Sequence, residues 1–276
     1  MTSEILVLGA TGTTGSRVLD GLRQHGVDAR GASRSAAGFA RFDWNDRKTW
    51  TNVLRGVTAV YLVGPVDGRD PVAAVTEFLE EAAAVGVRRT VLLSSSALAP
   101  AKTGPGALPE LVRQRMAEFA ILRPSWFMSN TFGTTPLAAG IRAGQVVTAT
   151  GDARVGFIDP EDIAAVAVQA LTIERPLNAE LVLTGPSAHS YAELCALASE
   201  MTGRTISHHS VSVEQFTAYL IDMDIPAAYA PLLAALDGQI RGGSEDRVTD
   251  TVEQIIGRPP RSLRQFLQAH REQLAT

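Results

Sequence analysis

Three glycines near the N-terminus have the spacing of a phosphate-binding turn. Gly9, Gly12 and Gly15 follow the apolar run Ile5 to Leu8 and precede a helix-like stretch from Ser16 to His25. In such a unit the first glycine allows a sharp turn off the strand, the second lets backbone N–H groups approach a phosphate, and the third lets the helix pack close to the strand. The helix N-terminus adds partial positive charge. The pattern predicts a site for the pyrophosphate of a dinucleotide rather than a plain glycine turn.

The choice of dinucleotide depends on the end of the second expected strand, Val27 to Ser33. Enzymes that use NAD usually carry Asp or Glu there to bind the ribose 2′-hydroxyl. This chain has Arg34 between two serines, Ser33 and Ser35. A guanidinium pairs bidentately with phosphate oxygens, so these residues favour the 2′-phosphate of NADP(H). The alternative is that Arg34 is a solvated loop residue.

Apolar runs and helix-like stretches alternate along the first half of the chain. Strands are expected at 27–33, 39–42, 58–63, 89–94 and 118–122, and helices at 46–55, 70–85 and 108–116. This alternation is typical of βαβ units with right-handed crossovers, in which ligands bind at the carboxyl ends of the strands. We therefore expect an α/β fold, with a Rossmann-like parallel sheet, helices on both faces and a smaller, mostly helical C-terminal substrate lobe.

The pattern changes beyond about residue 145, where short strands and several helices follow. We expect a dinucleotide-binding domain over 1–150 and a smaller substrate-binding lobe over 151–276. A helix over 159–171, with Asp159 as N-cap and Pro160 as its first residue, is expected to pack back on the first domain.

Composition restricts the class of partner. The 276 residues carry a net charge of −4 and no basic run with interleaved aromatic residues, so we expect a small-molecule substrate and no nucleic acid. No segment approaches eighteen uninterrupted apolar residues, and no signal peptide is evident, so we expect no membrane partner and a cytoplasmic location. The single cysteine, Cys195, is interpreted as a core residue. His208 and His209 are adjacent in an expected strand and point to opposite faces, so no metal site is expected.

Four segments together resemble the NmrA-like branch of the atypical short-chain dehydrogenases/reductases. They are Gly9 to Gly15, Leu92 to Ser96, Ile121 to Asn130 and Gly156 to Ala164. The third segment, Leu-Arg-Pro-Ser-Trp-Phe-Met-Ser-Asn, is most similar to the festuclavine/agroclavine dehydrogenases of ergot alkaloid biosynthesis and their bacterial relatives. The resemblance extends over nearly the whole chain and implies NADP(H) binding.

The resemblance also implies positions for the bound molecules. The turn residues that it places on the pyrophosphate are Gly9, Ala10, Thr11, Gly12, Thr13, Thr14 and Gly15. Ser33 and Arg34 would bind the 2′-phosphate, and Asp43 and Trp44 would border the adenine. Residues on the riboses and the nicotinamide would be Gly64, Pro65, Ser94, Ser95 and Pro124. Ser96, Trp126, Phe127 and Asn130 would line the substrate pocket, although Trp126 and Phe127 are equally of a type found in a core.

The acid/base pair of the usual short-chain dehydrogenases is absent. None of the four tyrosines is followed four residues later by lysine, and the chain has only two lysines, Lys48 and Lys102. The sequence therefore indicates no catalytic residue. Hydride transfer without a proton donor suits electron-poor acceptors such as iminium ions and quinones. Two other hypotheses are a non-catalytic NADP(H)-sensing regulator and a sugar-nucleotide epimerase, the latter disfavoured by the missing pair.

Overall fold

The computed structural model describes residues 4–65 and 68–274. The chain divides into two units. The first comprises Met1–Pro124, Pro160–Leu183 and Gln254–Gly257, and the second comprises Ser125–Asp159, Thr184–Glu253 and Arg258–Thr276. The division from the sequence lay at residue 150, whereas the chain enters the second unit directly after the strand that ends at Pro124. The hydrophobic pattern of the sequence does not change after Pro124, so nothing in it marks this boundary.

The first unit is built on seven strands in the order β3-β2-β1-β4-β5-β6-β9. Every neighbouring pair is parallel. The strands are β1 (Glu4–Val7), β2 (Ala29–Ser33), β3 (Ala40–Arg41), β4 (Val57–Val63), β5 (Arg89–Leu93), β6 (Glu118–Pro124) and β9 (Ala179–Leu183). The chain runs outward from β1 to β3 and then returns to β4 on the other side of β1. The expected Rossmann-like parallel sheet is confirmed, and its topological switch point lies at the carboxyl end of β1.

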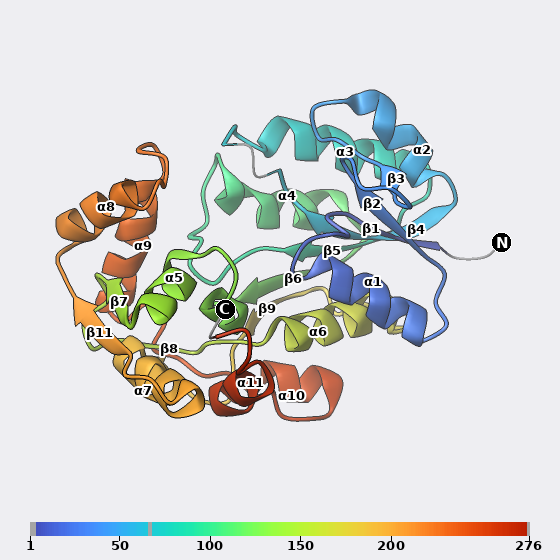
Figure 1. Cartoon of the computed structure of the whole chain (residues 1–276). Coiled ribbons are helices and arrows are strands. Elements are labelled where there is room, and N and C mark those ends of the chain that lie inside the picture. The colour runs from blue at the N-terminus through green and yellow to red at the C-terminus, as the bar shows by residue number, and fades with distance from the viewer. Residues whose placement is uncertain (1–3, 66–67, 275–276) are drawn as a thin grey trace. The chain divides into compact units, whose positions relative to one another are not determined.

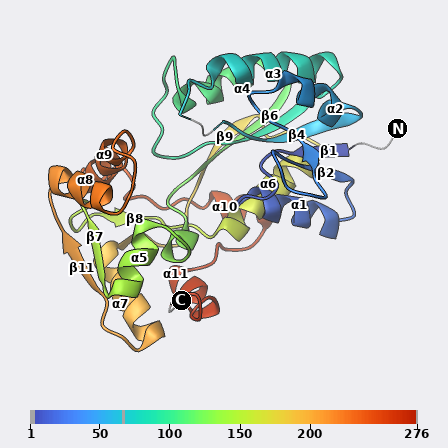
Figure 2. The same cartoon turned by 45° about the horizontal axis from the view of Figure 1, so that its top comes forward.

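Helices cover both faces of this sheet (Figures 1 and 2). On one face α1 (Gly15–Gln24) packs against α6 (Pro160–Thr172), and on the other α3 (Val72–Ala84) packs against α4 (Leu108–Arg115) and α2 (Trp50–Leu54). Right-handed crossovers from parallel strands require helices on both sides. A large hydrophobic core lies between the sheet and the helices α2, α3 and α4, and it includes Leu6, Trp50, Phe78 and Val112. Packing in this core fixes the strands whose ends carry the expected site residues.

The segment 46–55 is only partly the expected helix. It begins as a 3-10 helix over Arg47–Thr49 and continues as the five-residue α2. The Asp46 carboxylate accepts from the Lys48 N–H, and the Thr49 hydroxyl donates to the Asp46 carbonyl. Side chains that bond the backbone locally compete with an α-helical start. The helix is therefore shorter than its apolar pattern indicates.

The second unit combines two short sheets with helices. Parallel β7 (Gln145–Thr148) and β11 (Ser207–Ser210) form one sheet, and antiparallel β8 (Arg154–Val155) and β10 (His189–Ser190) form the other. The helices are α5 (Pro136–Ala143), α7 (Tyr191–Thr202), α8 (Val213–Asp222), α9 (Ala230–Arg241) and α11 (Leu263–Ala269), while α10 (Thr251–Ile256) has residues in both units. Capping boxes fix the starts of α7, α8 and α11, each with a serine and a Glu or Gln three residues later.

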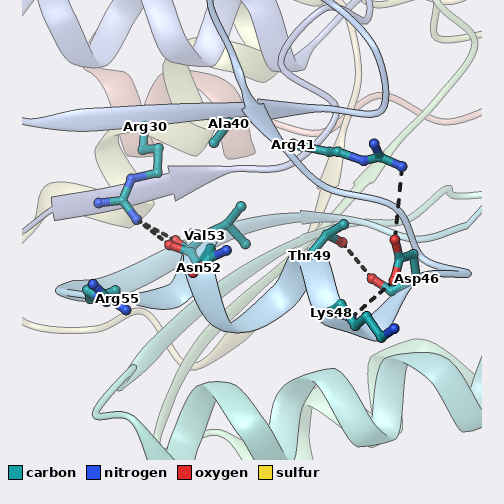
Figure 3. Close-up of a pocket in the computed structure, with 9 residues that line it drawn as sticks. All are labelled: Arg30, Ala40, Arg41, Asp46, Lys48, Thr49, Asn52, Val53 and Arg55. Atoms are coloured by element: carbon teal, nitrogen blue, oxygen red, sulfur yellow. Dashed lines mark hydrogen bonds and ion pairs between the residues drawn. The ribbon is translucent and has the colours of Figure 1, made fainter.

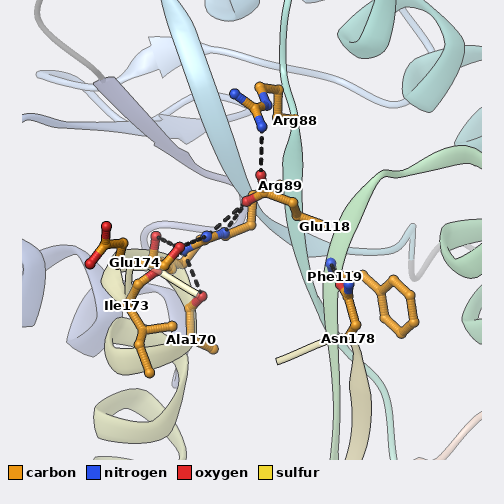
Figure 4. Close-up of polar contacts among 9 residues, drawn as sticks. Arg88, Arg89, Glu118, Phe119, Ala170, Ile173, Glu174 and Asn178 are labelled. Carbon is orange, nitrogen blue, oxygen red and sulfur yellow. Dashed lines mark hydrogen bonds and ion pairs between the residues drawn. The ribbon is translucent and has the colours of Figure 1, made fainter. Parts of the chain in front are cut away.

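A nearly buried arginine joins β5 to the end of α6 in the first unit (Figure 4). The side chain of Arg89, 11% exposed, donates from Nε to Glu118 at 2.8 Å. Its Nη1 donates to the carbonyls of Leu171 and Ile173 at 3.0 and 2.6 Å. Cations are favoured at a helix C-terminus because they meet the last unpaired carbonyls and the negative end of the dipole. Arg89 therefore ties the returning helix to the sheet.

Substitution of Arg89 tests this tie. We expect Arg89→Ala to lower the free energy of unfolding in urea by about 2–3 kcal/mol, because buried helix carbonyls and Glu118 lose a charged donor. Arg88→Ala is a matched control, since Arg88 also pairs with Glu118, at 3.1 Å, but its side chain is 76% exposed. Its loss should change stability by less than about 1 kcal/mol. Equal effects of the two variants would show that the α6 contacts contribute nothing.

Candidate functional site

The carboxyl end of β1 opens onto exposed backbone. Gly9, Thr11, Gly12 and Thr13 are exposed, whereas Thr14 and Gly15, where α1 begins, are buried. The Gly12 N–H closes the turn on the Gly9 carbonyl at 2.9 Å. Within residues 4–65 and 68–274, the N–H groups of Thr11 and Thr13 form no hydrogen bond. The turn therefore has exposed residues with free backbone donors just before a helix, an arrangement suited to binding phosphate.

The three glycines of the turn meet different constraints. Gly9 has a φ of +64°, in the left-handed region that glycine adopts without strain. A Cβ on Gly15 would lie 2.2 Å from the Gly9 carbonyl oxygen, closer than any side chain tolerates. A Cβ on Gly12 would lie 3.2 Å from the same oxygen, which is tight but not impossible. Gly15 is therefore the position at which space alone requires glycine.

The N-terminus of α1 has no side-chain cap and no acidic residue in its first turn. Thr14 occupies the N-cap, but its hydroxyl oxygen accepts from the Tyr61 hydroxyl of β4 at 3.0 Å. Burial raises the pKa of Tyr61 far above its ordinary value, so the phenol stays protonated and remains a donor. Tyr61 thus holds Thr14 inward. Its contribution was not predicted, because the two residues lie far apart in the sequence and meet only through the pairing of β1 with β4.

Arg34 directly follows β2, the strand that pairs with β1. Its side chain is exposed, and in the described part of the chain it forms no hydrogen bond or ion pair. Ser33 is half-buried and its hydroxyl accepts from the Ala36 N–H at 3.3 Å. An arginine without an intramolecular partner therefore stands at the same edge of the sheet as the glycine turn.

The other expected cofactor residues also follow strands of the first unit. Because these strands are parallel, their carboxyl ends meet at one edge of the sheet. Asp43 and Trp44 come after β3, Gly64 and Pro65 after β4, Ser94 and Ser95 after β5, and Pro124 ends β6. The Ser94 hydroxyl is buried without a hydrogen-bond partner among the described residues. A polar group in that state is satisfied most simply by a ligand or a water.

Asp43 and Trp44 have local structural contacts as well. The Asp43 carboxylate accepts from the Asn45 N–H at 2.9 Å, as in an Asx turn. Trp44 packs edge-on against Phe42 and Phe78, with ring centroids 5.0 and 5.3 Å apart, and remains half-buried. These contacts fix the two residues without covering them completely.

The four residues expected around the substrate do not all come together. Trp126 and Asn130 line one pocket of about 240 Å³ within the second unit. Phe127 is not among the residues that line it, and its backbone pairs with Ile158 in an isolated bridge. Ser96 belongs to the first unit, where its N–H donates to the Pro124 carbonyl at 3.0 Å.

The rest of the wall of this pocket consists of residues that were not predicted from the sequence. Most are apolar or aromatic, and they include Leu137, Val147, Tyr191, Phe216, Leu220, Leu233 and Leu236. They come from α5, β7, α7, α8 and α9, and their convergence depends on the packing of α8 against α9. One wall residue is charged: Asp237 of α9, which is 8% exposed.

Asp237 has a single intramolecular partner in the described residues. Its Oδ2 accepts from the Ala149 N–H at 2.9 Å. Burial raises the pKa of this carboxyl to about 6, and the hydrogen bond from Ala149 offsets only part of that effect. A signal was present in the sequence: Asp237 falls on the buried stripe of α9 with Ala230, Ala234 and Ile240. An acidic residue on the apolar face of a helix is unusual.

A larger cavity, of about 550 Å³, lies beside the edge strand β3 (Figure 3). Several cations line it, but they do not converge on its centre. Arg30 donates to the carbonyls of Asn52 and Val53 at 3.2 and 2.8 Å, and Arg41 lies 3.9 Å from Asp46. The arginine contacts attach α2 to β2, and the cavity contains none of the expected site residues.

Residues 4–65 and 68–274 contain no group of three or more His, Cys, Asp or Glu side chains placed to hold a metal ion. In the same residues, no helix has both the length and the apolar character needed to cross a membrane.

Comparison with known proteins agrees with the arrangement of the strands. A model of the NmrA-like family matches residues 1–238. An uncharacterized oxidoreductase of Bacillus subtilis, YesF, is 39% identical over 273 residues, covering 96% of this chain and 94% of the relative. Festuclavine synthase I of Penicillium roqueforti is 30% identical over 283 residues, covering 97% and 98% of the two chains.

Solved structures share the fold. An NADPH-dependent quinone oxidoreductase from Escherichia coli, complexed with NADPH, matches with a TM-score of 0.83 and 22% identity, over 96% of this chain and 99% of that chain. At this identity the comparison shows a common arrangement of elements.

The Asp237 carboxyl predicts a pH-dependent difference in stability. Because its pKa is higher in the folded protein than in the unfolded chain, its stabilising contribution is lost as the pH rises through about 6. Asp237→Asn keeps an acceptor for Ala149 but removes the charge. Relative to the unsubstituted protein, the free energy of unfolding of this variant in urea should rise by up to about 3 kcal/mol from about pH 4 to pH 8.

The control for this experiment is Asp222→Asn, which removes an exposed carboxylate of α8. Its effect should change little over the same pH interval. A pH-independent effect of Asp237→Asn would contradict a raised pKa.

Proposed function

The chain belongs to the NmrA-like family and is an oxidoreductase, and we propose that it transfers hydride from NADPH to a small electron-poor organic acceptor. The observation that carries the proposal is the open glycine turn at the switch point of the sheet. Arg34, which has no hydrogen bond or ion pair among the described residues, stands at the same edge. A phosphate-binding turn and a separate guanidinium suit a dinucleotide with a third phosphate.

The residues at this edge fit NADPH. The N–H groups of Thr11 and Thr13 would bind the pyrophosphate, and no acidic side chain in the first turn of α1 would repel it. Arg34 and Ser33 would bind the 2′-phosphate. NADPH, when bound, supplies the hydride. The remaining strand-end residues would flank its rings and riboses, with Asp43 and Trp44 by the adenine, Gly64, Pro65, Ser94 and Ser95 by the riboses, and Pro124 by the nicotinamide.

The lack of a Tyr-x-x-x-Lys pair supports an acceptor that needs little acid catalysis. Tyr61 is fully buried and its hydroxyl already donates to Thr14, so it has a structural role and is not placed to donate a proton to a substrate. An iminium carbon accepts hydride without any proton, and a quinone is a strongly electron-poor acceptor. For such acceptors the protein contributes mainly orientation and the exclusion of water.

The second unit supports the acceptor half of the proposal. Its pocket of about 240 Å³ is lined mainly by apolar and aromatic side chains with few polar groups, which is typical of sites for small organic molecules. One relative is named a festuclavine synthase and one structural neighbour a quinone oxidoreductase.

Arg34→Ala tests the selection of NADPH. Loss of a charged contact should raise the dissociation constant for NADPH by about 10- to 150-fold and leave that for NADH nearly unchanged, measured by calorimetric titration. Arg55→Ala removes another exposed arginine of the first unit and serves as the control. Equal weakening of both dinucleotides by Arg34→Ala would show that Arg34 does not contact the 2′-phosphate.

A panel of acceptors tests the reaction. Purified protein with NADPH should oxidise it in the presence of at least one quinone, iminium salt or cationic dye, followed by the loss of absorbance of NADPH. Ordinary ketones should react poorly, because their reduction requires a proton donor. NADPH binding without oxidation by any acceptor would contradict the reductase and favour an NADP(H)-binding regulator.

A further inference from the structure

We propose that the pocket of the second unit binds an organic cation and that Asp237 recognises its charge. The inference names the acceptor class of the proposed reductase, and for turnover it rests on that function. Binding of the cation depends only on residues of the second unit, so it can be examined without NADPH.

The first argument is the imbalance of charge in the pocket. Asp237 is the only ionised side chain among the residues that line it in the described part of the chain, and no Lys, Arg or His lines it with Asp237. The carboxylate has one hydrogen bond, from Ala149, and its other oxygen has no partner among the described residues. A buried carboxylate with one neutral donor is poorly compensated. A ligand that carries a positive charge supplies the missing partner.

The second argument is the composition of the walls. Trp126, Tyr191 and Phe216 contribute aromatic rings to the same pocket as Asp237. Aromatic faces attract cations, and the attraction increases when water is excluded. Aliphatic side chains of α8 and α9 complete the lining. The volume of about 240 Å³ lies just below the range of drug-sized sites, so a ligand of one or two rings fits best.

A purely structural role for Asp237 is a poor alternative. An asparagine would accept the Ala149 N–H equally well and would avoid the cost of a buried charge. Alanine neighbours on the same stripe of α9, Ala230 and Ala234, show that small apolar residues fit this face. A buried charge that destabilises the fold is characteristic of functional sites.

The titratable groups that surround Asp237 place no opposite charge in the pocket. On α7, burial raises the pKa of Tyr191 well above its ordinary value, so it stays neutral. On β11, His208 is hydrogen-bonded to Thr148 at 2.8 Å, and burial lowers its pKa, which favours the neutral ring. Arg241, at the end of α9, is exposed and lies against Gly151. None of these groups provides a counter-ion within the pocket.

The pH dependence follows from the carboxyl. Since burial raises the pKa of Asp237 to about 6, the group is ionised at pH 8 and mostly protonated at pH 5. A cation should therefore bind more tightly at the higher pH. A neutral molecule of the same shape leaves the carboxylate unpaired and should bind better at the lower pH.

The experiment compares two fluorescent probes of equal shape, N-methylquinolinium and 1-methylnaphthalene, by titration without NADPH. At pH 8 the protein should bind the cation at least tenfold more tightly than the neutral probe, and this preference should largely disappear at pH 5. Asp237→Asn should abolish the preference at pH 8. Asp222→Asn, which changes an exposed carboxylate, should retain it.

Each outcome decides the inference. Equal affinity for the two probes, or a preference that survives in Asp237→Asn, would overturn it. If that variant does not fold, the pH dependence of the unsubstituted protein still provides the test, and a flat profile counts against the inference. Oxidation of NADPH by a quinone with no cation preference would refute only the role of Asp237. A cation preference with no NADPH oxidation would refute only the reductase.

Discussion

The ligand-facing edge of the first unit depends on the close approach of Gly15 to the carbonyl of Gly9. A methyl group on Gly15 would lie 2.2 Å from that oxygen, so α1 can begin directly over the end of β1 only with glycine at this position. The short turn leaves Gly12 and Thr13 exposed and brings Thr14 within reach of Tyr61. Because β2 and β4 pair with β1, Arg34 and Gly64 arrive at the same edge. The Gly15–Gly9 contact fixes the turn after β1, and parallel pairing brings the residues that follow β2 and β4 to the same edge.

The two units differ in how many partners their buried charged side chains have. Arg89 in the first unit meets a carboxylate and several helix carbonyls, so every part of its guanidinium has a partner and the charge supports the fold. Asp237 in the second unit meets one backbone N–H and otherwise faces a mainly apolar pocket. Burial without compensation favours the neutral acid. The first arrangement is complete within the protein, whereas the second is completed by a ligand of opposite charge.

Sequence reasoning was most accurate where neighbouring residues act together. Apolar runs that alternate with helix-like stretches predicted the parallel sheet, and the three glycines predicted the turn after β1. The segment 46–55 was less predictable, because Asp46 and Thr49 bond to the backbone and shorten the helix. The boundary after Pro124 was not predictable from local sequence, since β6 of the sheet runs directly into the second unit. Trp126 and Asn130 were identified as pocket residues by resemblance, but the rest of the wall was not.

The order of residues along the chain is sufficient to establish the parallel sheet and to place Gly9, Arg34 and Ser94 at strand ends. Parallel strands share one polarity, so residues that follow them must meet at one edge. The pocket around Asp237 exists only in the folded chain. Its walls come from segments between Trp126 and Asp237 that have no common periodicity, and they meet through the packing of α8, α9 and β7. Burial of the carboxyl, and with it the raised pKa, follows from that packing alone.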